Sequence, residues 1–239
     1  MALPLLFVTM LACIHVFANN ISHLHTLSRC KWLSLAGGIS VAFVFVHILP
    51  ELHSLQESLK EDGKPAIFSM DFLYVMALAG VLLFYGLEKA IIKYEEKNAS
   101  DEGMAIEDSI FWWHIGMFAA FNILIGYYFH HELQVNGTSS FLTFIALGFH
   151  FLINDYSLLQ HHEKMYHNTG RWIMAGAVVA GWGIGLVYTI PDVISSSLFA
   201  LLAGAIVVNS FKEELPKDKE SNYGFFFAGA TAYAFLIML

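Results

Sequence analysis

Residues 148–162 read GFHFLINDYSLLQHH, an apolar stretch that contains a His, an Asn and an Asp within six positions. On a helix, His150 and Asn154 lie one turn apart on one face, and Asp155 lies about 140° around from His150. Such side chains are costly in the hydrocarbon core of a membrane unless they face protein or water. A neutral imidazole nitrogen and an anionic oxygen together suit a divalent ion such as zinc. The three residues are therefore candidate metal ligands.

The polar edge continues toward the end of this segment. Asp155 and His162 are seven positions apart and form a stripe next to that of His150, while His161 returns to the His150 side. The preceding apolar span carries Asn122 in FNILIG, which we expect to face these residues. We take Asn122, His161 and His162 as further candidate ligands.

A second candidate position lies in VFVHILPEL, where His47 and Glu51 are one helical turn apart. Pro50 loosens the helix between them because it lacks a backbone donor. An ion entering from outside would meet a nitrogen and a carboxylate here.

For each of these residues an ordinary alternative stays open. An Asn or His in a membrane helix often only bonds a neighbouring helix, a His at the membrane edge is often solvated, and Pro with Glu is common at helix ends.

The composition predicts a membrane protein. Hydrophobic residues make up 57% of the 239 residues and charged residues 13%, about half the roughly 25% of a soluble domain. The net charge of −8 argues against nucleic acid as a partner. Cys13 and Cys30 do not suggest a disulfide framework. The first apolar run lacks a basic start, so we expect it to stay in the protein as a span.

About eight apolar stretches approach the roughly 20 residues that a helix needs to cross the bilayer. We place them at 3–19, 33–53, 70–90, 110–130, 140–160, 171–189, 193–212 and 223–239. The expected fold is an all-α, polytopic membrane protein with one integral membrane domain over residues 1–239. The longest connection, 91–109, is acidic without an apolar period, and we expect a flexible cytoplasmic loop.

The basic residues orient these spans. With the N-terminus outside, the first, third, fifth and seventh loops are cytoplasmic, and they hold all the Lys and Arg residues except Lys60 and Lys64. By the positive-inside rule both termini lie outside. We expect an integral protein of the plasma (inner) membrane whose surroundings are the lipid bilayer, and the sequence leaves a homodimer open.

Two segments resemble each other. Residues 35–50, LAGGISVAFVFVHILP, and 202–216, LAGAIVVNSFKEELP, both begin with LAG-x-I and end in Leu-Pro. Because the second and seventh spans run in opposite directions, this similarity predicts an inverted repeat, the common architecture of secondary transporters. Spans one to three and six to eight would be the repeats, with spans four and five between them. Alternatively, two helices rich in small residues share such strings without being related.

The span order, the long third loop, H-x-L-P-E at the end of the second span and E-E-L-P at the end of the seventh resemble the ZIP family of divalent metal transporters over most of the chain. That resemblance implies a 3+2+3 bundle with a transport site on the fourth and fifth helices. In the family the fourth helix carries H-N-x-x-D. Here Asn122 matches its Asn, while Phe121 and Ile125 stand where the His and the acid would be.

The fifth helix of the family carries H-E-x-x-H or a similar motif. His150 matches its first His, Phe151 stands where the Glu would be, Asn154 takes the second His position, and Asp155 follows. These departures leave at most one site, without a binuclear centre. The resemblance then implies a permease that moves a divalent cation (zinc first, then iron or manganese) toward the cytoplasm. From outside to inside the expected route passes His47 and Glu51, then His150, Asn154, Asp155 and Asn122, and finally His161 and His162.

Two other classes remain in view. Phe121, Ile125 and Phe151 favour a relative that no longer transports and serves as a membrane scaffold or sensor. The stretch HHEKMYH at 161–167 suggests a histidine-metal membrane enzyme, but only the pair in SHLHT at 22–26 could supplement it. No nucleophile with a base at helical spacing and no phosphate loop points to another enzyme. We therefore expect no enzymatic activity and no organic cofactor, with the metal ion as transported substrate.

Overall fold

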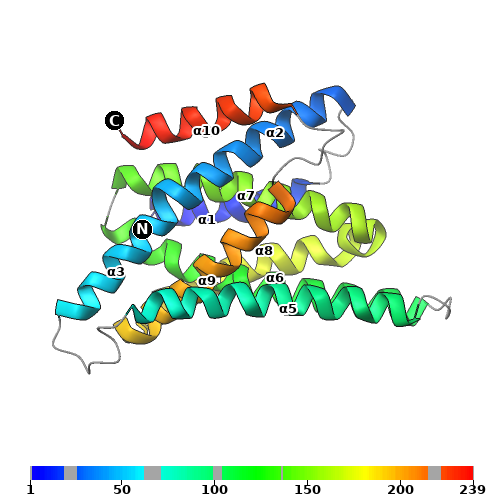
Figure 1. The fold of residues 1–239 in the computed structure, drawn as a ribbon, viewed down its shortest axis with the longest axis horizontal. Helices are drawn as coiled ribbons and strands as arrows, with labels where there is room; N and C mark the ends of the chain where they lie inside the picture. The colour runs from blue at the N-terminus through cyan, green and yellow to red at the C-terminus, as the bar shows by residue number, and fades with distance from the viewer. Residues whose placement is uncertain are drawn as a thin grey trace.

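A computed structural model describes residues 2–18, 26–61, 71–98, 104–135, 137–214 and 222–238. Within these residues the protein is all-helical, and no strand occurs. The elements are α1 (Ala2–Phe17), α2 (Thr26–Phe43), η2 (Val44–Ile48), α3 (Leu49–Glu61), α5 (Phe72–Asn98), α6 (Met104–Val135), α7 (Gly137–Met165), η3 (Tyr166–Gly170), α8 (Arg171–Val187), α9 (Asp192–Asn209), η4 (Ser210–Glu214) and α10 (Tyr223–Ile237). Figure 1 shows the chain passing back and forth along the long axis, with the start of α1 and the end of α10 at the same end of the molecule.

Several helices have the length and composition of membrane spans. Five helical stretches of the described chain qualify, namely Cys30–Lys60, Phe72–Tyr94, Ser109–His130, Phe141–Val187 and Asp192–Lys212, and the apolar helices Leu5–Phe17 and Tyr223–Ile237 are shorter. The stretch Phe141–Val187 contains two helices that run in opposite directions in Figure 1, α7 and α8. This arrangement fits a helical membrane protein.

Two boundaries differ from the expected ones. The second helical pass does not end near residue 53, because α3 continues to Glu61. The connection expected at 91–109 is largely helical, since α5 runs to Asn98 and α6 begins at Met104. Glu, Lys and Tyr fill the end of α5 without Gly or Pro, and Glu and Lys are good helix formers. The polar composition of this segment therefore does not interrupt the helix.

Each of the two similar segments contains a π-helical turn just before its Leu-Pro. In the first, η2 ends at Ile48, immediately before Leu49 and Pro50. In the second, η4 ends at Glu214, and Leu215 follows. A π turn is a common way to insert a residue into a helix and to change the direction of its hydrogen bonds. At Pro50, which has no N–H to donate, it lets the helix continue through the proline.

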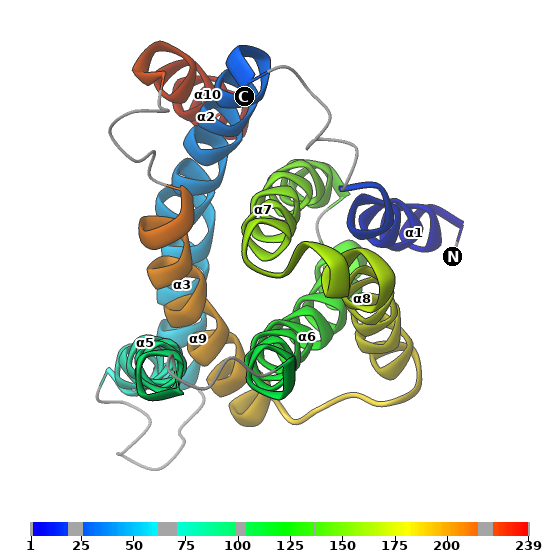
Figure 2. The same cartoon turned by 90° about the vertical axis from the view of Figure 1, so that its right-hand side faces the viewer.

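The helices form two groups (Figure 2). The bundle consists of α1, α6, α7, η3 and α8, and the wall consists of α2, η2, α3, α5, α9, η4 and α10. In the bundle, α6 lies along α8, and α1 contacts both α7 and α8. In the wall, α2 lies along α10 and α5 along α9. The two groups meet where α7 faces α2 and η4, and where α6 faces α5 and α9.

Glycines bring the paired helices into backbone contact. A Cβ atom on Gly80 of α5 would overlap the carbonyl of Leu201 in α9, and one on Gly204 of α9 would overlap the carbonyl of Ala77 in α5. Small residues permit this close approach of membrane helices. The same reciprocal arrangement occurs at Gly38 and Gly229 between α2 and α10, and at Gly126 and Gly181 between α6 and α8. Among the glycines whose surroundings are described, these approaches all fall within one group.

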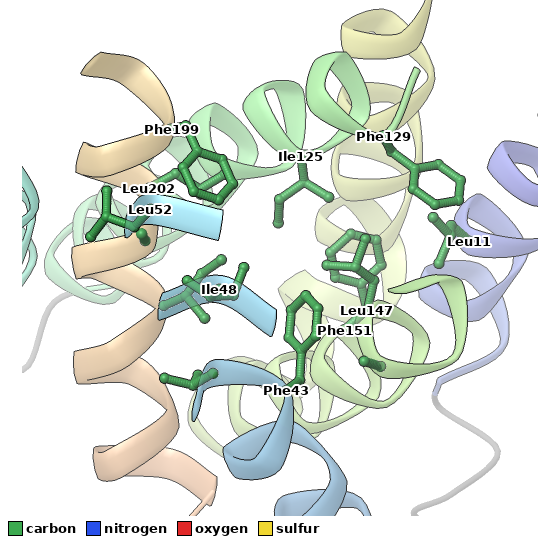
Figure 3. Close-up of a cluster of buried hydrophobic side chains, with 14 of the residues drawn as sticks. Leu11, Phe43, Ile48, Leu52, Ile125, Phe129, Leu147, Phe151, Phe199 and Leu202 are labelled. Carbon is green, nitrogen blue, oxygen red and sulfur yellow. The ribbon is translucent and has the colours of Figure 1, made fainter. Parts of the chain in front are cut away.

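The largest apolar cluster lies where the bundle and the wall meet. Figure 3 shows side chains of the wall, including Phe43, Ile48 and Phe199, pointing toward Ile125 and Phe151 of the bundle. All five are less than 10% exposed. Side-chain packing thus joins the two groups, and the polar residues considered below are embedded in or next to this apolar layer.

Candidate functional site

A small cavity lies between the bundle and the wall. Its volume of about 20 Å³ is enough for one water molecule. The bundle side is lined by α6 and α7 and the wall side by α5 and α9. The lining residues are Phe84, Phe118, Phe121, Asn122, Ile125, His150, Phe151, Asn154, Ala205, Ile206 and Asn209. Its polar groups are therefore one imidazole and three carboxamides within an otherwise apolar surface.

A chain of hydrogen bonds crosses from the bundle to the wall at this cavity. The Asn154 amide nitrogen lies 3.1 Å from His150 Nε2 and donates to it. On the other side, Asn209 Nδ2 of the wall donates to Asn154 Oδ1 at 2.6 Å. Since Nε2 of His150 accepts, its Nδ1 carries the proton and faces Ser40 Oγ of α2 at 3.4 Å. All four side chains are buried. The pairing of His150 and Asn154 on one helix face agrees with the expectation from their spacing.

Asp155 belongs to a different cluster, which lies wholly within the bundle. Its two carboxylate oxygens lie 2.8 and 2.9 Å from Nδ1 of His15 in α1. The hydroxyl of Tyr166 in η3 donates to the same carboxylate. Asp155 and His15 are fully buried, and Tyr166 nearly so. A buried carboxylate with an imidazole and a phenol as partners is satisfied without a metal ion.

His15 links this carboxylate to the cavity wall. Its second nitrogen, Nε2, lies 3.0 Å from Asn122 Oδ1. The orientation of that amide is fixed, because Asn122 Nδ2 donates to the Phe118 carbonyl at 2.8 Å. Oxygen atoms thus face both nitrogens of His15, and this ring joins the Asp155 carboxyl group to the Asn122 side chain at the cavity.

The two histidines at the end of α7 have different surroundings. His162 is buried, and its Nε2 lies 2.9 Å from His114 Nδ1 of α6. The backbone at His162 leaves the helical conformation, with φ −140° and ψ 45°, so α7 is kinked there. His161 is exposed. His162 therefore pairs with α6, and the expected stripe with Asp155 does not form a common site.

At the other end of the molecule, His47 and Glu51 differ in their exposure. His47 is half-buried, stacks on Phe43 with ring centroids 5.1 Å apart, and lies 3.2 Å from Thr143 Oγ1 through Nε2. Glu51 is exposed. The π turn η2 contains His47, so the two residues are not related by an uninterrupted α-helical turn.

The single metal site expected from the sequence is divided by the structure. His150 and Asn154 line the cavity and Asp155 does not, while Asn122 touches both clusters. Among the residues that the structure describes, no three His, Cys, Asp or Glu side chains are grouped as ligands for a metal ion. The histidines of HHEKMYH also do not converge, because His167 is half-buried and lies beside Asn168. The pair in SHLHT, His23 and His25, lies outside the described residues.

Three residues of these clusters were not among the candidates from the sequence. His15 is the one imidazole in the first apolar run, Asn209 lies inside the segment that resembles residues 35–50, and Tyr166 follows the histidines of α7. Each stands alone at its place in the sequence, so no spacing marks it. The signal available for His15 and Asn209 was a polar side chain within a span, which is costly and therefore informative.

Comparison with known proteins adds no relative. No family model, no curated protein and no solved structure matches this chain.

Proposed function

We propose that the protein is an integral membrane permease that carries a divalent metal cation through the cavity between the bundle and the wall. The observation that carries this proposal is the cavity itself, to which His150, Asn154, Asn122 and Asn209 contribute polar groups inside the apolar interface of two helix groups. Secondary transporters bind their substrates near the bilayer midplane at the interface of structural repeats. The lining of this cavity combines α5 and α9, which belong to different proposed repeats, with α6 and α7, which belong to neither.

An eight-span, ZIP-like inverted-repeat architecture with three, two and three helices is part of the proposal. The reciprocal glycine contacts support it, because α2 with α10 and α9 with α5 are the pairs that exchange when the two repeats are superposed. The π turns η2 and η4 at corresponding positions of the two similar segments support it as well. In this proposal both termini lie outside, and the membrane is the plasma (inner) membrane.

Transport would follow from movement of the bundle against the wall. The helices within each group touch through their backbones, whereas the groups meet through side chains. A cation would break the hydrogen bond between Asn154 and His150. It would then bind the Asn154 side-chain oxygen and the His150 ring nitrogen. An imidazole nitrogen and carboxamide oxygens are suitable ligands for zinc, iron and manganese. Because none of the described residues that line the cavity is a carboxylate, such an ion is bound weakly and can leave, as transport requires.

The test is uptake of Zn²⁺, Fe²⁺, Mn²⁺ and Cd²⁺ into proteoliposomes that contain the purified protein. We expect saturable uptake of at least one ion by the wild type and its loss in the double variant His150→Ala/Asn154→Ala. The matched control is His53→Ala, which removes an imidazole at 2.8 Å from the Tyr74 hydroxyl on the surface of the wall and should transport normally. Uptake that is unchanged in the double variant contradicts the proposed site.

A second function is favoured by the surroundings of Asp155, because hydrogen bonds with His15 and Tyr166 already occupy its two carboxyl oxygens. In a relative of transporters that serves as a membrane scaffold or sensor, such internal hydrogen bonds would take the place of bonds to a metal ion. Titration calorimetry of the purified protein separates the two functions. Saturable metal binding supports the permease, and its absence with all four ions supports the scaffold or sensor.

A further inference from the structure

Asn209 is the one polar residue that the wall contributes to the lining of the cavity. The other lining residues of the wall are Phe84, Ala205 and Ile206. Asn209 lies at the end of α9, directly before the π turn η4. Its Nδ2 donates to Asn154 Oδ1 at 2.6 Å, so the side-chain amide is oriented with its nitrogen toward the bundle.

The oxygen of the same amide has no hydrogen-bond partner. Asn209 Oδ1 is buried, and the residue is only 3% exposed. A buried acceptor without a partner costs free energy that a ligand at this position would recover. Asn209 is one of the residues that line the cavity, and we take this oxygen as the acceptor that an ion there would engage.

We propose that Asn209 is the ligand with which the wall holds the transported cation, through its unpartnered Oδ1. This inference rests on the proposed permease function and names the residue that completes its site. His150, Asn154 and Asn122 belong to the bundle, so the cation has its full set of protein ligands only when bundle and wall are packed as they are here. Movement of the bundle away from Asn209 removes one ligand and weakens binding, which favours release.

The ligand set also defines the class of cation. The lining residues offer carboxamide oxygens and an imidazole nitrogen, and none of them carries sulfur or a carboxylate. Oxygen and nitrogen ligands suit hard and borderline ions, whereas soft ions prefer sulfur. The wild-type site therefore favours Mn²⁺ or Fe²⁺ over Cd²⁺.

The experiment introduces sulfur at this position. In the Asn209→Cys variant a cadmium ion would bind the thiolate, and the thiol proton would be released on binding. Wild type and variant are titrated calorimetrically with MnCl₂ and CdCl₂. The ratio of Cd²⁺ affinity to Mn²⁺ affinity should be about tenfold or more higher in the variant, because a charge-assisted bond to the thiolate replaces a neutral bond to the amide. Such a gain cannot result from damage to the fold.

The matched control is Ser210→Cys. Ser210 is also buried, has an unpartnered Oγ and is the next residue along the chain, but it does not line the cavity. We expect no change of metal preference in this variant. An unchanged ratio in Asn209→Cys that still elutes as a folded protein, or an equal gain in Ser210→Cys, overturns the inference. If the wild type binds no metal at all, the permease proposal itself is wrong, and the two failures are thus distinguished.

Discussion

The contacts within the bundle and within the wall differ in kind from the contacts between them. Inside each group, glycines such as Gly126 and Gly204 let helix backbones touch. The bundle also contains the fully buried pair of His15 and Asp155. Between the groups, side chains make the contacts: an apolar layer, the bond from Asn209 to Asn154, and a cavity with room for one water molecule.

This difference indicates which parts of the molecule can separate. Backbone contact at glycines and the short hydrogen bonds of a buried pair lose their stabilisation steeply with any displacement, because both depend on short distances. An interface of rotatable side chains around a cavity can repack at lower cost. We infer that the bundle and the wall each behave as a unit and that the plane between them is where the structure changes.

The largest effect should come from the buried pair inside the bundle. Replacing His15 or Asp155 alone with Leu leaves a buried group without its partner, and we expect each single variant to lose about 3–5 kcal/mol of stability. The double variant His15→Leu/Asp155→Leu removes both groups, so it should lose less than the sum of the two by about 2 kcal/mol. Unfolding in detergent micelles measures all three.

The control for this cycle is the exposed ion pair of Glu57 and Lys60, 2.8 Å apart in α3. Glu57→Leu should leave the unfolding midpoint where it is, because exposed pairs contribute little. Additive losses at His15 and Asp155 would show that the two side chains act independently. The proposed difference between the contacts inside the bundle and the contacts between bundle and wall would then lose its main support.

The sequence indicated the helical passes because apolar runs of spanning length leave few alternatives. The turn at Pro191 between α8 and α9 is an example, since Pro and a following Asp interrupt a nearly continuous apolar stretch. Helix ends were less well predicted. The polar end of α5 was expected to be a loop, but good helix formers without a breaker extend the helix to Asn98.

The candidate site was predictable only where its residues share a helix. His150 and Asn154 are one turn apart, and that spacing marked them. The residues that complete each cluster, Asn209 for the cavity and His15 for Asp155, come from α9 and α1. Which helices are neighbours depends on packing at small residues, and a single sequence does not fix those pairs. For this reason the sequence grouped Asp155 with His150, whereas the structure places its carboxyl group beside His15.

Glycines test the tightness of the interfaces within the wall. We expect Gly204→Ala to destabilise the protein by about 1–3 kcal/mol, because its methyl group would overlap the Ala77 carbonyl of α5. Gly86 of α5 has no atom near the position of a Cβ. Gly86→Ala should therefore be neutral or stabilising by up to about 1 kcal/mol, since Ala is the better helix former. Unfolding midpoints in detergent compare the two, and equal effects would contradict backbone contact at Gly204.

The smallest effect concerns a bond between the groups. The Tyr128 hydroxyl of α6 donates to the Ser195 carbonyl of α9, next to the turn that joins α8 of the bundle to α9 of the wall. Tyr128→Phe removes that bond, which is worth about 1 kcal/mol. A bond that exists only while bundle and wall are packed favours the closed arrangement, so its loss increases the open fraction. About 1 kcal/mol corresponds to roughly fivefold.

Labelling of a cavity cysteine measures that fraction. In the Asn209→Cys background, reaction of the thiol with a maleimide should become about fivefold faster when Tyr128→Phe is added, because residue 209 becomes accessible only when the interface opens. The matched control is Tyr74→Phe, which removes a tyrosine hydroxyl bond of 2.8 Å to His53 between two helices of the wall, on its surface. That variant should leave the labelling rate unchanged. Equal acceleration by both variants would mean that thiol exposure follows general loosening of the fold, and the bundle and the wall would then not be separate units.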